Sequence, residues 1–566
     1  MCRWKGVTCG RRHQRVTELN LSFHNLEGSL SPSIGNLSFL RLIDLQDNKL
    51  SGEIPQELGR LSRLRTLNLS YNSFRGIIPP NLSYCYNLIY FDASKNNLFG
   101  KIPEQLHFLW KLEELYIFDN YLTGELPTSI GNLSNLQVIS LKVNCLQGRV
   151  PDTLGQLRSL IFLGLGQNSF SGKIPPSIYN ITSLRVFLLQ LNNLHGRLPQ
   201  NLAFTLPNLE KFIVGKNILS GPVLHLLANA SKIREFDISG NYFTGKVSID
   251  FNGLKNLFWL NLGNNSLGFG LADDLAFISS LTNCSKLEVI GLFMNQFGGK
   301  LPNSIANLSI TMKALVMGGN QISGIIPPGI GNLANVEKLG MQNNQLTGPI
   351  PKAIGKLKRL QEVALSGNNL LGTIPDSIGN LTLLSELNLD FNKFEGSIPS
   401  SLGRCQNLLV LSIAQNRLTG NVPQQIFSII TLSIALDLSD NHLTGSIPLE
   451  VGNLKNLVAL DISGNQFHGH IPFSLGGCVC LESLNLSGNS FNGSIPQSLS
   501  SLRSIKELDL SSNKLAGQIP KYFQNLSLLE SLNLSDNHFE GEVPTKEFSA
   551  MQQQFHWLGM RNFAGV

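Results

Sequence analysis

Residues 387–399 read LNLDFNKFEGSIP, and the same pattern recurs along almost the entire chain. Residues 411–423, LSIAQNRLTGNVP, repeat its apolar residues, asparagine, glycine and proline in the same places. The asparagine is present in 21 of 22 copies, and His24 replaces it in the first copy. Of the 21 intervals between copies, 17 are 24 residues long, three are 25, and the one from Asn265 to Asn295 is 30. A fixed period in this range predicts a solenoid of stacked coils.

Each position in the copy has a physical role. The alternation of apolar and polar residues before the asparagine predicts a short half-buried strand, and successive strands are expected to pair in parallel. The asparagine has donors and an acceptor for backbone groups buried between coils, where an unpaired group costs about 1–3 kcal/mol. Glycine, as at Gly52, allows a tight turn, and proline, as at Pro55, suits an edge because it has no N–H. The predicted fold is an α/β solenoid of about 22 repeats with a parallel sheet on its concave face.

Composition narrows the possible functions. The 566 residues include 44 basic and 38 acidic side chains, scattered along the chain, which give a formal net charge of +6. No cluster of Lys and Arg with interleaved aromatic residues indicates a nucleic-acid partner, and no apolar run is long enough to span a membrane. The ten histidines are dispersed without metal-ligand spacing, and Asp437, Asp461 and Asp509 recur at one strand position, as surface residues of a repeat do. We therefore expect no catalytic residue, no metal, no cofactor and no enzymatic activity.

The repeat resembles the leucine-rich repeat, and its G-x-I-P element resembles the plant form; the resemblance covers residues 16–544. The long interval contains residues 267–284, LGFGLADDLAFISSLTNC. Its six additional residues are expected to bulge or to form a short helix, with Asp273 or Asp274 near the start. This segment and residues 303–309, NSIANLS, are similar to plant receptor kinases of the type of the elongation-factor-Tu receptor and the rice bacterial-blight resistance receptor.

The resemblance implies three parts of the chain. Residues 1–15 resemble the end of the N-terminal cysteine cap of these receptors, and residues 16–544 form the solenoid. Residues 545–566 do not match the family's C-terminal cap and are expected to be disordered or aberrant. Such receptors continue into a single membrane helix and a Ser/Thr kinase, whereas this chain has no Gly-rich loop, His-Arg-Asp or Asp-Phe-Gly motif. We therefore expect a fragment that ends before the membrane span and the kinase.

Eight cysteines fall into different groups. The resemblance implies that Cys2 and Cys9 are bridged in the cap and that Trp4 covers the first coil. Four others replace leucine at core positions and are expected to be small buried hydrophobic residues: Cys85, Cys284, Cys405 and Cys478. Cys145 and Cys480 have no assigned role.

Fifteen Asn-x-Ser/Thr sites are potential glycosylation sites of a secreted protein. They are Asn20, Asn36, Asn68, Asn81, Asn132, Asn180, Asn229, Asn264, Asn283, Asn307, Asn380, Asn485, Asn492, Asn525 and Asn533. The alternative is that Asn-Leu-Ser simply arises from the repeat consensus. Four of the sites point out of the concave sheet: Asn20, Asn68, Asn485 and Asn533. The strands of copies four to ten carry no such site, which favours a ligand footprint in or just beyond that window.

The central copies depart from the local consensus at outward strand positions. There they carry apolar, aromatic and charged residues of the kind that often mark an interaction surface. These candidate ligand-binding residues are Tyr116, Phe118, Asp119, Lys142, Val143, Leu188, Gln190, Leu191, Ile213, Lys216, Trp259, Phe293 and Met294. Neutral drift on a tolerant surface is the alternative interpretation.

The resemblance implies the extracellular ligand-recognition module of a plant receptor-like kinase. Its ligand would be a peptide or protein in innate immunity, bound on the concave face, with a co-receptor kinase near the C-terminal repeats. The module would lie on the apoplastic side of a plasma membrane crossed once by the parent protein. The alternatives are the ectodomain of a hormone or developmental receptor and a soluble wall protein of the polygalacturonase-inhibitor type, although the latter has about ten repeats.

Overall fold

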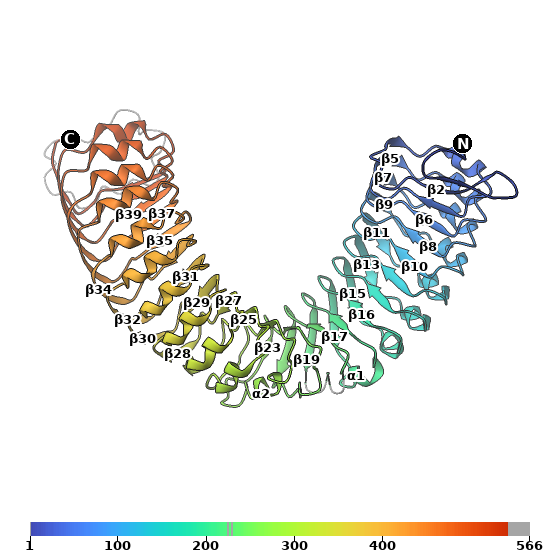
Figure 1. Ribbon diagram of the computed structural model, residues 1–566, viewed down its shortest axis with the longest axis horizontal. Coiled ribbons are helices and arrows are strands. Elements are labelled where there is room, and N and C mark those ends of the chain that lie inside the picture. The colour runs from blue at the N-terminus through green and yellow to red at the C-terminus, as the bar shows by residue number, and fades with distance from the viewer. Residues whose placement is uncertain (1, 224–225, 228–229, 542–566) are drawn as a thin grey trace. The chain divides into compact units, whose positions relative to one another are not determined.

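The computed structural model describes residues 2–223, 226–227 and 230–541. It divides into two compact units, one up to Gly268 and one from Phe269 onward. A coil typically contains a short first strand, a second strand and a short helix, and within each unit the elements of successive coils lie in rows (Figure 1). We call these rows the strand face (first strands and the three residues after each), the lateral face (second strands) and the helix face. The tail at 545–566 and Asn229 lie outside the described residues.

In the first unit, β1 (Val7–Cys9) pairs antiparallel with the first of the first strands. The first strands are β2 (Val16–Asn20), β4 (Leu42–Asp44), β6 (Thr66–Asn68), β8 (Tyr90–Asp92), β10 (Glu114–Tyr116), β12 (Val138–Ser140), β14 (Phe162–Gly164), β16 (Val186–Leu188), β18 (Lys211–Ile213), β20 (Glu235–Asp237) and β22 (Trp259–Asn261). The second strands are β3 (Glu27–Ser29), β5 (Lys49–Glu53), β7 (Ser73–Gly76), β9 (Asn97–Gly100), β11 (Tyr121–Glu125), β13 (Cys145–Arg149), β15 (Ser169–Lys173), β17 (Asn193–Arg197), β19 (Ile218–Pro222), β21 (Tyr242–Gly245) and β23 (Ser266–Leu267). The helices are η1 (Pro32–Asn36), η2 (Gln56–Arg60), η3 (Pro80–Tyr84), η4 (Glu104–Phe108), η5 (Thr128–Asn132), η6 (Asp152–Gln156), η7 (Pro176–Asn180) and α1 (Leu202–Thr205).

The second unit repeats this arrangement. The first strands are β24 (Val289–Gly291), β25 (Ala314–Val316), β27 (Lys338–Gly340), β29 (Glu362–Ala364), β31 (Glu386–Asn388), β33 (Val410–Ser412), β35 (Ala435–Asp437), β37 (Ala459–Asp461), β39 (Ser483–Asn485), β41 (Glu507–Asp509) and β43 (Ser531–Asn533). The second strands are β26 (Ser323–Ile325), β28 (Gln345–Gly348), β30 (Asn369–Gly372), β32 (Lys393–Gly396), β34 (Arg417–Asn421), β36 (His442–Gly445), β38 (Gln466–His470), β40 (Ser490–Gly493), β42 (Lys514–Gly517) and β44 (His538–Phe539). The helices are α2 (Ile278–Leu281), η8 (Asn303–Asn307), η9 (Pro328–Asn332), η10 (Lys352–Lys356), η11 (Asp376–Asn380), η12 (Ser400–Arg404), η13 (Gln424–Ser428), η14 (Leu449–Asn453), η15 (Phe473–Gly477), η16 (Gln497–Ser501) and η17 (Lys521–Asn525).

The strands pair in parallel with a register of one repeat. For example, Leu115 of β10 pairs with Ile139 of β12, and both side chains are fully buried. Equivalent residues of neighbouring copies therefore lie side by side within a unit. The core is a stack of such apolar residues, including the stacked rings of Phe187 and Phe212, whose centroids are 5.4 Å apart. The predicted parallel solenoid is confirmed.

The repeated asparagine joins each coil to the one before it. Asn120 is 6% exposed, and its Nδ2 donates to the carbonyl oxygen of Ala93 at 3.0 Å, while its Oδ1 accepts from the N–H of Leu98 at 2.9 Å. Ala93 and Leu98 belong to the preceding copy, so the side chain satisfies backbone groups that would otherwise be buried unpaired. This is the role predicted for the asparagine from the sequence.

The residue before this asparagine turns the chain away from the strand. Where it is not glycine it has a positive φ, between 49° and 58°, as at Val143 with φ 56°. A left-handed conformation is unfavourable for most side chains, most of all for a β-branched one. The outward candidate residues at this position therefore occupy a strained turn.

The long copy forms a turn followed by the one-turn helix α2. Asp274, only 1% exposed, accepts three backbone N–H groups through Oδ2, from Phe269 at 3.0 Å, Leu271 at 2.9 Å and Gly298 at 3.0 Å. Asp274 therefore organises the additional residues from within, immediately before α2. The sequence predicted either a bulge or a short helix here, and the helix is present as α2.

The N-terminal cap consists of β1 and the loop before β2. Cys2 and Cys9 form a disulfide, with their Cα atoms 5.6 Å apart. Trp4, however, is 65% exposed and does not cover the first coil, contrary to the expectation from the resemblance. No described element packs on the outer side of Trp4, because the described cap adds only the antiparallel strand β1.

Candidate functional site

The strand face displays outward side chains at the first and third residues of each first strand. In β10 the burial alternates from half-buried Glu114 through buried Leu115 to half-buried Tyr116. The residue directly after the strand is buried, as at Ile117, and the next outward positions are the second and third residues after the strand. The candidate residues occupy these positions: Trp259 is the first strand residue, Tyr116, Leu188 and Ile213 are third, Phe118, Lys142, Gln190 and Phe293 follow by two, and Asp119, Val143, Leu191, Lys216 and Met294 follow by three. All belong to the first unit except Phe293 and Met294, which belong to the second.

Aromatic and basic side chains meet near Tyr116. The rings of Tyr116 and Tyr90 are 5.7 Å apart, and their hydroxyls donate to Glu114 at 2.8 Å and to Asp92 at 3.1 Å. Partial burial, reinforced by these carboxylates, raises the pKa of both tyrosines, so both stay neutral hydrogen-bonding groups at physiological pH. The nitrogen of Lys142 lies 5.4 Å from the ring centroid of Phe118, within cation–π range.

The sequence interpretation missed residues that extend this aromatic surface. Besides Tyr90, Lys95 lies over the ring of Tyr71, with its nitrogen 4.6 Å from the centroid, and Tyr71 is 43% exposed. A signal was available, because Tyr71, Tyr90 and Lys95 occupy the same outward positions as the candidates. They stand in copies three and four, whose other outward residues follow the consensus.

Copies six to nine combine apolar and cationic side chains. Val143 and Leu191 are 38% and 37% exposed, and Leu188 and Ile213, in copies eight and nine, are half-buried. Lys211 in this region is ion-paired with Glu235 at 2.5 Å. Within the described residues, Lys142 and Lys216 form no ion pair, so their charges remain available to a ligand.

Gln190 does not project as expected. An added Cβ at Gly166 would lie 2.7 Å from the Gln190 side chain, so that side chain lies flat over the glycine of the preceding coil. Its Oε1 atom is buried and has no hydrogen-bond partner among the described residues. Gln190 is therefore part of the floor of the strand face, because glycine leaves room for it to fold down.

The C-terminal copies carry a different, self-contained pattern on the strand face. Asp437 accepts from the N–H and the Oγ of Ser439 at 3.0 and 2.7 Å, and Asn485 accepts in the same way from Ser487 at 3.1 and 2.7 Å. Burial raises the pKa of Asp437, and the neighbouring carboxylates of Asp461 and Asp390 add to that effect, against hydrogen bonds that lower it. These side chains stabilise the turn after the strand, as predicted for structural repeat residues.

The potential glycosylation sites differ in exposure. Ten have exposed side chains: Asn20, Asn36, Asn132, Asn180, Asn264, Asn283, Asn307, Asn380, Asn492 and Asn525. Asn81, Asn485 and Asn533 are half-buried, whereas Asn68 is only 8% exposed. The amide of Asn68 donates to Gln46 at 3.2 Å and accepts from Ser70 at 3.1 Å, which disfavours a glycan there.

The four cysteines expected in the core are fully buried. Burial raises the pKa of Cys85 and Cys478 to about 12 and that of Cys284 and Cys405 to about 11, so these thiols are protonated and covered at neutral pH. Cys145 and Cys480 are exposed.

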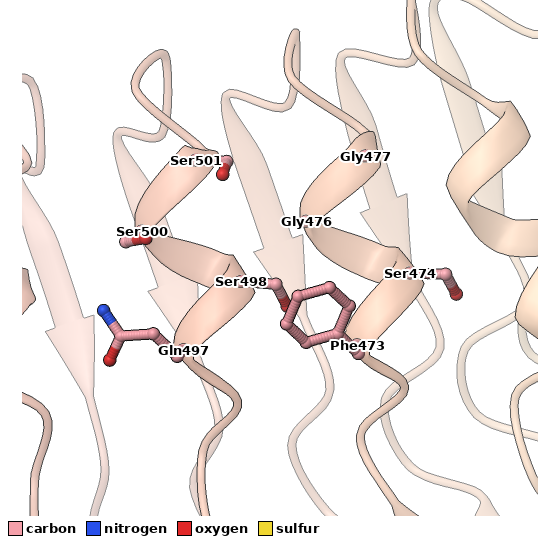
Figure 2. A pocket seen from close by; sticks show the side chains of 8 residues that line it. All are labelled: Phe473, Ser474, Gly476, Gly477, Gln497, Ser498, Ser500 and Ser501. Atoms are coloured by element: carbon pink, nitrogen blue, oxygen red, sulfur yellow. The ribbon is translucent and has the colours of Figure 1, made fainter.

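The helix face has a shallow hollow of about 470 Å³ between η15 and η16. Figure 2 shows the ring of Phe473, which is 73% exposed, beside Ser498, with Gly476 and Gly477 along the neighbouring turn. The backbone of Gly476 packs directly on that of Ser498, where a Cβ atom would overlap the carbonyl group, and the hollow contains no charged side chain. Serine and glutamine side chains line it beside the ring of Phe473, without the cationic groups of the strand face.

No helix in residues 2–223, 226–227 and 230–541 has both the length and the apolar character needed to cross a membrane. In the same part of the chain, no three or more His, Cys, Asp or Glu side chains are grouped so that they could hold a metal ion.

Comparison with known proteins identifies leucine-rich repeats in this chain. Two leucine-rich-repeat profiles match the chain. One covers residues 110–170 and 480–539, and the other covers 39–61, 63–85, 311–333, 335–357, 359–381, 383–405, 434–454 and 456–478.

Two plant receptor kinases are similar to this chain in sequence. The LRR receptor-like serine/threonine-protein kinase EFR of Arabidopsis thaliana is 62% identical over 341 residues, which is 60% of this chain and 33% of EFR. The receptor kinase-like protein Xa21 of Oryza sativa subsp. japonica is 46% identical over 93 residues, 16% of this chain and 9% of Xa21. The chain thus spans a third or less of the length of these relatives.

Solved plant ectodomains share the fold along nearly the whole chain. The Arabidopsis receptor kinase HAESA, in complex with the peptide hormone IDA and the co-receptor SERK1, superimposes with a TM-score of 0.86 at 34% identity, covering 98% of this chain and 92% of HAESA. The plant peptide hormone receptor RGFR1, in complex with RGF2, superimposes with a TM-score of 0.81 at 31% identity, covering 98% of this chain and 99% of RGFR1. The chain therefore belongs to the leucine-rich-repeat family and is an ectodomain of the plant receptor-kinase type.

Proposed function

We propose that this chain is the extracellular ligand-recognition module of a plant receptor kinase that perceives a peptide or protein in innate immunity. The long similarity to EFR supports the immune assignment. The disulfide of Cys2 and Cys9 and the many exposed Asn-x-Ser/Thr sites support an extracellular location, since disulfides persist in oxidising compartments.

The contrast between copies of the strand face carries this proposal. In the C-terminal copies, outward side chains such as Asp437 and Asp509 are engaged in hydrogen bonds with serines of their own coil. In copies five, eight and nine the same position holds Tyr116, Leu188 and Ile213, and no serine stands two residues later to bond with them. Apolar, aromatic and cationic groups exposed together are typical of binding surfaces.

The chemistry of this surface favours a ligand with apolar and acidic side chains. Lys142 and Lys216 offer uncompensated positive charges, and Val143, Leu188 and Leu191 offer apolar contact between them. An extended peptide would meet both kinds of side chain as it crosses successive coils.

A co-receptor is the second partner in this proposal. HAESA has been solved with both a peptide hormone and the co-receptor SERK1. We assign the co-receptor contact to the C-terminal copies, where the strand face is polar and uniform. The ligand contact would remain in the central copies.

A single substitution can test the ligand footprint. Asp237, in copy ten, becomes a glycosylation site in the D237N variant, because the sequence would read Asn-Ile-Ser up to Ser239. Asn485 shows that asparagine at this position accepts the same serine hydrogen bonds. The glycan would stand on the strand face between Lys216 and Trp259. We expect the glycosylated D237N protein to lose at least about tenfold in ligand affinity.

The matched control is D237N/S239A, which has the same asparagine without a glycan and should bind as the wild type does. D461N creates the same signal in copy 19 and should leave ligand binding unchanged. The probes are bacterial elongation factor Tu, chosen from the resemblance of the long copy, and a set of plant peptide hormones. Unchanged affinity of glycosylated D237N for the probe that binds would overturn the footprint. Binding of a hormone alone would replace the immune assignment with that of a hormone receptor.

A further inference from the structure

A row of cations lies on the lateral face of the first unit. Arg149, Lys173 and Arg197, here called the cation row, are the last residues of β13, β15 and β17, and all three are exposed. Because β13 pairs with β15 and β15 with β17 in parallel, the three residues stand on successive coils. Neighbouring strands are about 4.8 Å apart, so the face presents one positive charge per coil.

The stems of the cation row are held by glycines. An added Cβ at Gly172, Gly196 or Gly221 would lie 3.1, 3.1 and 2.9 Å from the Cγ atom of the row residue one coil earlier. These glycines also have positive φ, of 81°, 99° and 95°. Each cationic stem therefore lies along the bare backbone of the next coil, and the three charged groups are aligned in one direction.

The charges of the cation row are not neutralised by a contact. Among the described residues, no carboxylate lies within ion-pair distance of any of the three. Two acidic residues, Glu125 and Asp152, line the same region, and Asp152 accepts a hydrogen bond from Ser177 at 2.7 Å. Three uncompensated cations on consecutive coils attract a polyanion more strongly than isolated charges do.

The cation row borders a hollow in the first unit. This hollow, of about 810 Å³, is lined by Arg149 and Lys173 together with Ser171, His195, Pro151 and Pro175, among others. It is open and elongated over copies five to eight. Hydroxyl and imidazole groups stand beside charged groups and small apolar surfaces, which suits a polar ligand with alternating hydroxyls and C–H faces.

We propose that the cation row and this hollow bind a linear polysaccharide that carries a carboxylate on each sugar. The carboxylates of such a chain can pair with the cationic groups of the row, while its hydroxyls and C–H faces meet Ser171, His195 and the two prolines of the hollow. An acidic peptide offers the charges without the hydroxyls. The assignment is independent of the strand-face ligand, since it uses a different face and a different chemistry.

Binding of oligogalacturonides to the intact glycoprotein tests the proposal. We expect saturable binding that weakens as ionic strength rises, and no binding of the fully methyl-esterified oligomer, which has the same rings without charge. The triple variant R149Q/K173Q/R197Q should lose about tenfold or more in affinity, as three modest charge contacts together would give.

The matched control removes the same number of charges elsewhere. Lys352, Lys356 and Arg359 are exposed cations on and just after η10, on the helix face of the second unit. The variant K352Q/K356Q/R359Q should change the affinity less than twofold. Equal losses in the two triple variants would mean non-specific attraction and would overturn the site.

A gain-of-binding variant separates the site from effects on folding. Glu125 interrupts the row between Lys101 and Arg149, and its stem lies over Gly148 as that of Lys101 lies over Gly124. The E125K variant should therefore fit and raise the affinity two- to threefold. No gain, or equally tight binding of polyglutamate or of RNA, would contradict a uronate-specific site.

Discussion

At the residue scale, one position on the strand face shows how similar side chains differ in energy. The third residue of the first strand is Asp or Asn in many copies, and both accept from the serine two residues later, as Asp437 and Asn485 do. The aspartate, however, brings a charge into a partly buried row that already contains Asp461. A neutral amide makes the same hydrogen bonds without that desolvation.

The D437N variant should therefore be more stable than the wild type at neutral pH. The pKa of Asp437 is raised in the folded protein, so the fold favours the protonated acid. The aspartate therefore lowers the stability of the fold least below the pKa that the side chain has in the unfolded state. Its destabilising effect grows as the pH rises through the pKa of the folded state. The stabilisation by asparagine should vanish in acid and reach a plateau towards neutrality. Thermal unfolding as a function of pH measures it.

This comparison needs protein made without N-glycosylation, because D437N creates Asn-Leu-Ser. The variant S439A, which removes the hydroxyl donor and keeps the charge, is the control and should not reproduce the pH dependence. A D437N protein that is less stable at pH 7 would show that the carboxylate is favourable in this row.

Val143 combines strain with a candidate role in binding. Its φ of 56° is unfavourable for a β-branched residue, whereas Asn343 occupies the same position with φ 53°. We expect V143N to stabilise the protein by about 1 kcal/mol, because asparagine tolerates this conformation. The same change removes an apolar side chain that is 38% exposed, so ligand affinity should fall. Denaturation midpoints and a binding titration on one preparation measure the stability and the ligand affinity. A denaturation midpoint that does not rise in V143N would count against the strain argument.

At the element scale, the repeated asparagines form a ladder between coils that also share strand pairing, apolar contacts and single side-chain hydrogen bonds, such as that from Ser183 to the carbonyl oxygen of Arg158. One side chain satisfies backbone groups in two copies, and it is almost inaccessible to water. Its loss leaves a donor and an acceptor unpaired at the same place. The short helices of the helix face are linked in some coils by a single hydroxyl, as where Thr153 donates to the carbonyl oxygen of Thr128 at 2.6 Å and Ser177 to that of Asp152 at 2.8 Å.

The N120A variant should destabilise its coil by about 3 kcal/mol, because the N–H of Leu98 and the carbonyl of Ala93 lose their partners. Hydrogen exchange at Leu98 should accelerate. Asn193 is exposed at the start of β17, so N193A should change stability by less than about 0.5 kcal/mol. Similar effects for the two substitutions would remove the special role of the ladder.

At the scale of the whole molecule, each unit is a linear array in which a coil contacts mainly its neighbours. The stability of such an array is close to a sum of local terms, so that opening in one region need not spread to the others. The four buried thiols report on this, since one, Cys85, is in the first unit and the other three are in the second.

Pulsed thiol labelling should modify only Cys145 and Cys480 in the native protein and six cysteines after denaturation without a reducing agent. In N120A, labelling at Cys85 should increase, whereas Cys405 and Cys478 should stay protected. Peptide mass spectrometry assigns each site, and the wild type gives the reference rates. Simultaneous exposure of all the buried thiols in N120A would indicate one cooperative structure instead.

The sequence by itself determined the coil, its register and its interior. A period of 24 residues fixes which residues of successive copies lie side by side, so the parallel strands, the asparagine ladder and the buried positions of Cys85 and Cys284 could be predicted. The outward positions of the candidate residues follow from the same alternation. These features depend on contacts that recur in every copy.

Only the tertiary structure decided how side chains on different coils meet. The pairing of Tyr90 with Tyr116, the folded-down Gln190 and the exposed Trp4 depend on the particular neighbours of each residue. The cation row depends on parallel pairing of second strands that the sequence interpretation did not anticipate. A repeat specifies on which face of the coil a side chain leaves the backbone. The space left by the adjacent coil decides the position that the side chain finally occupies.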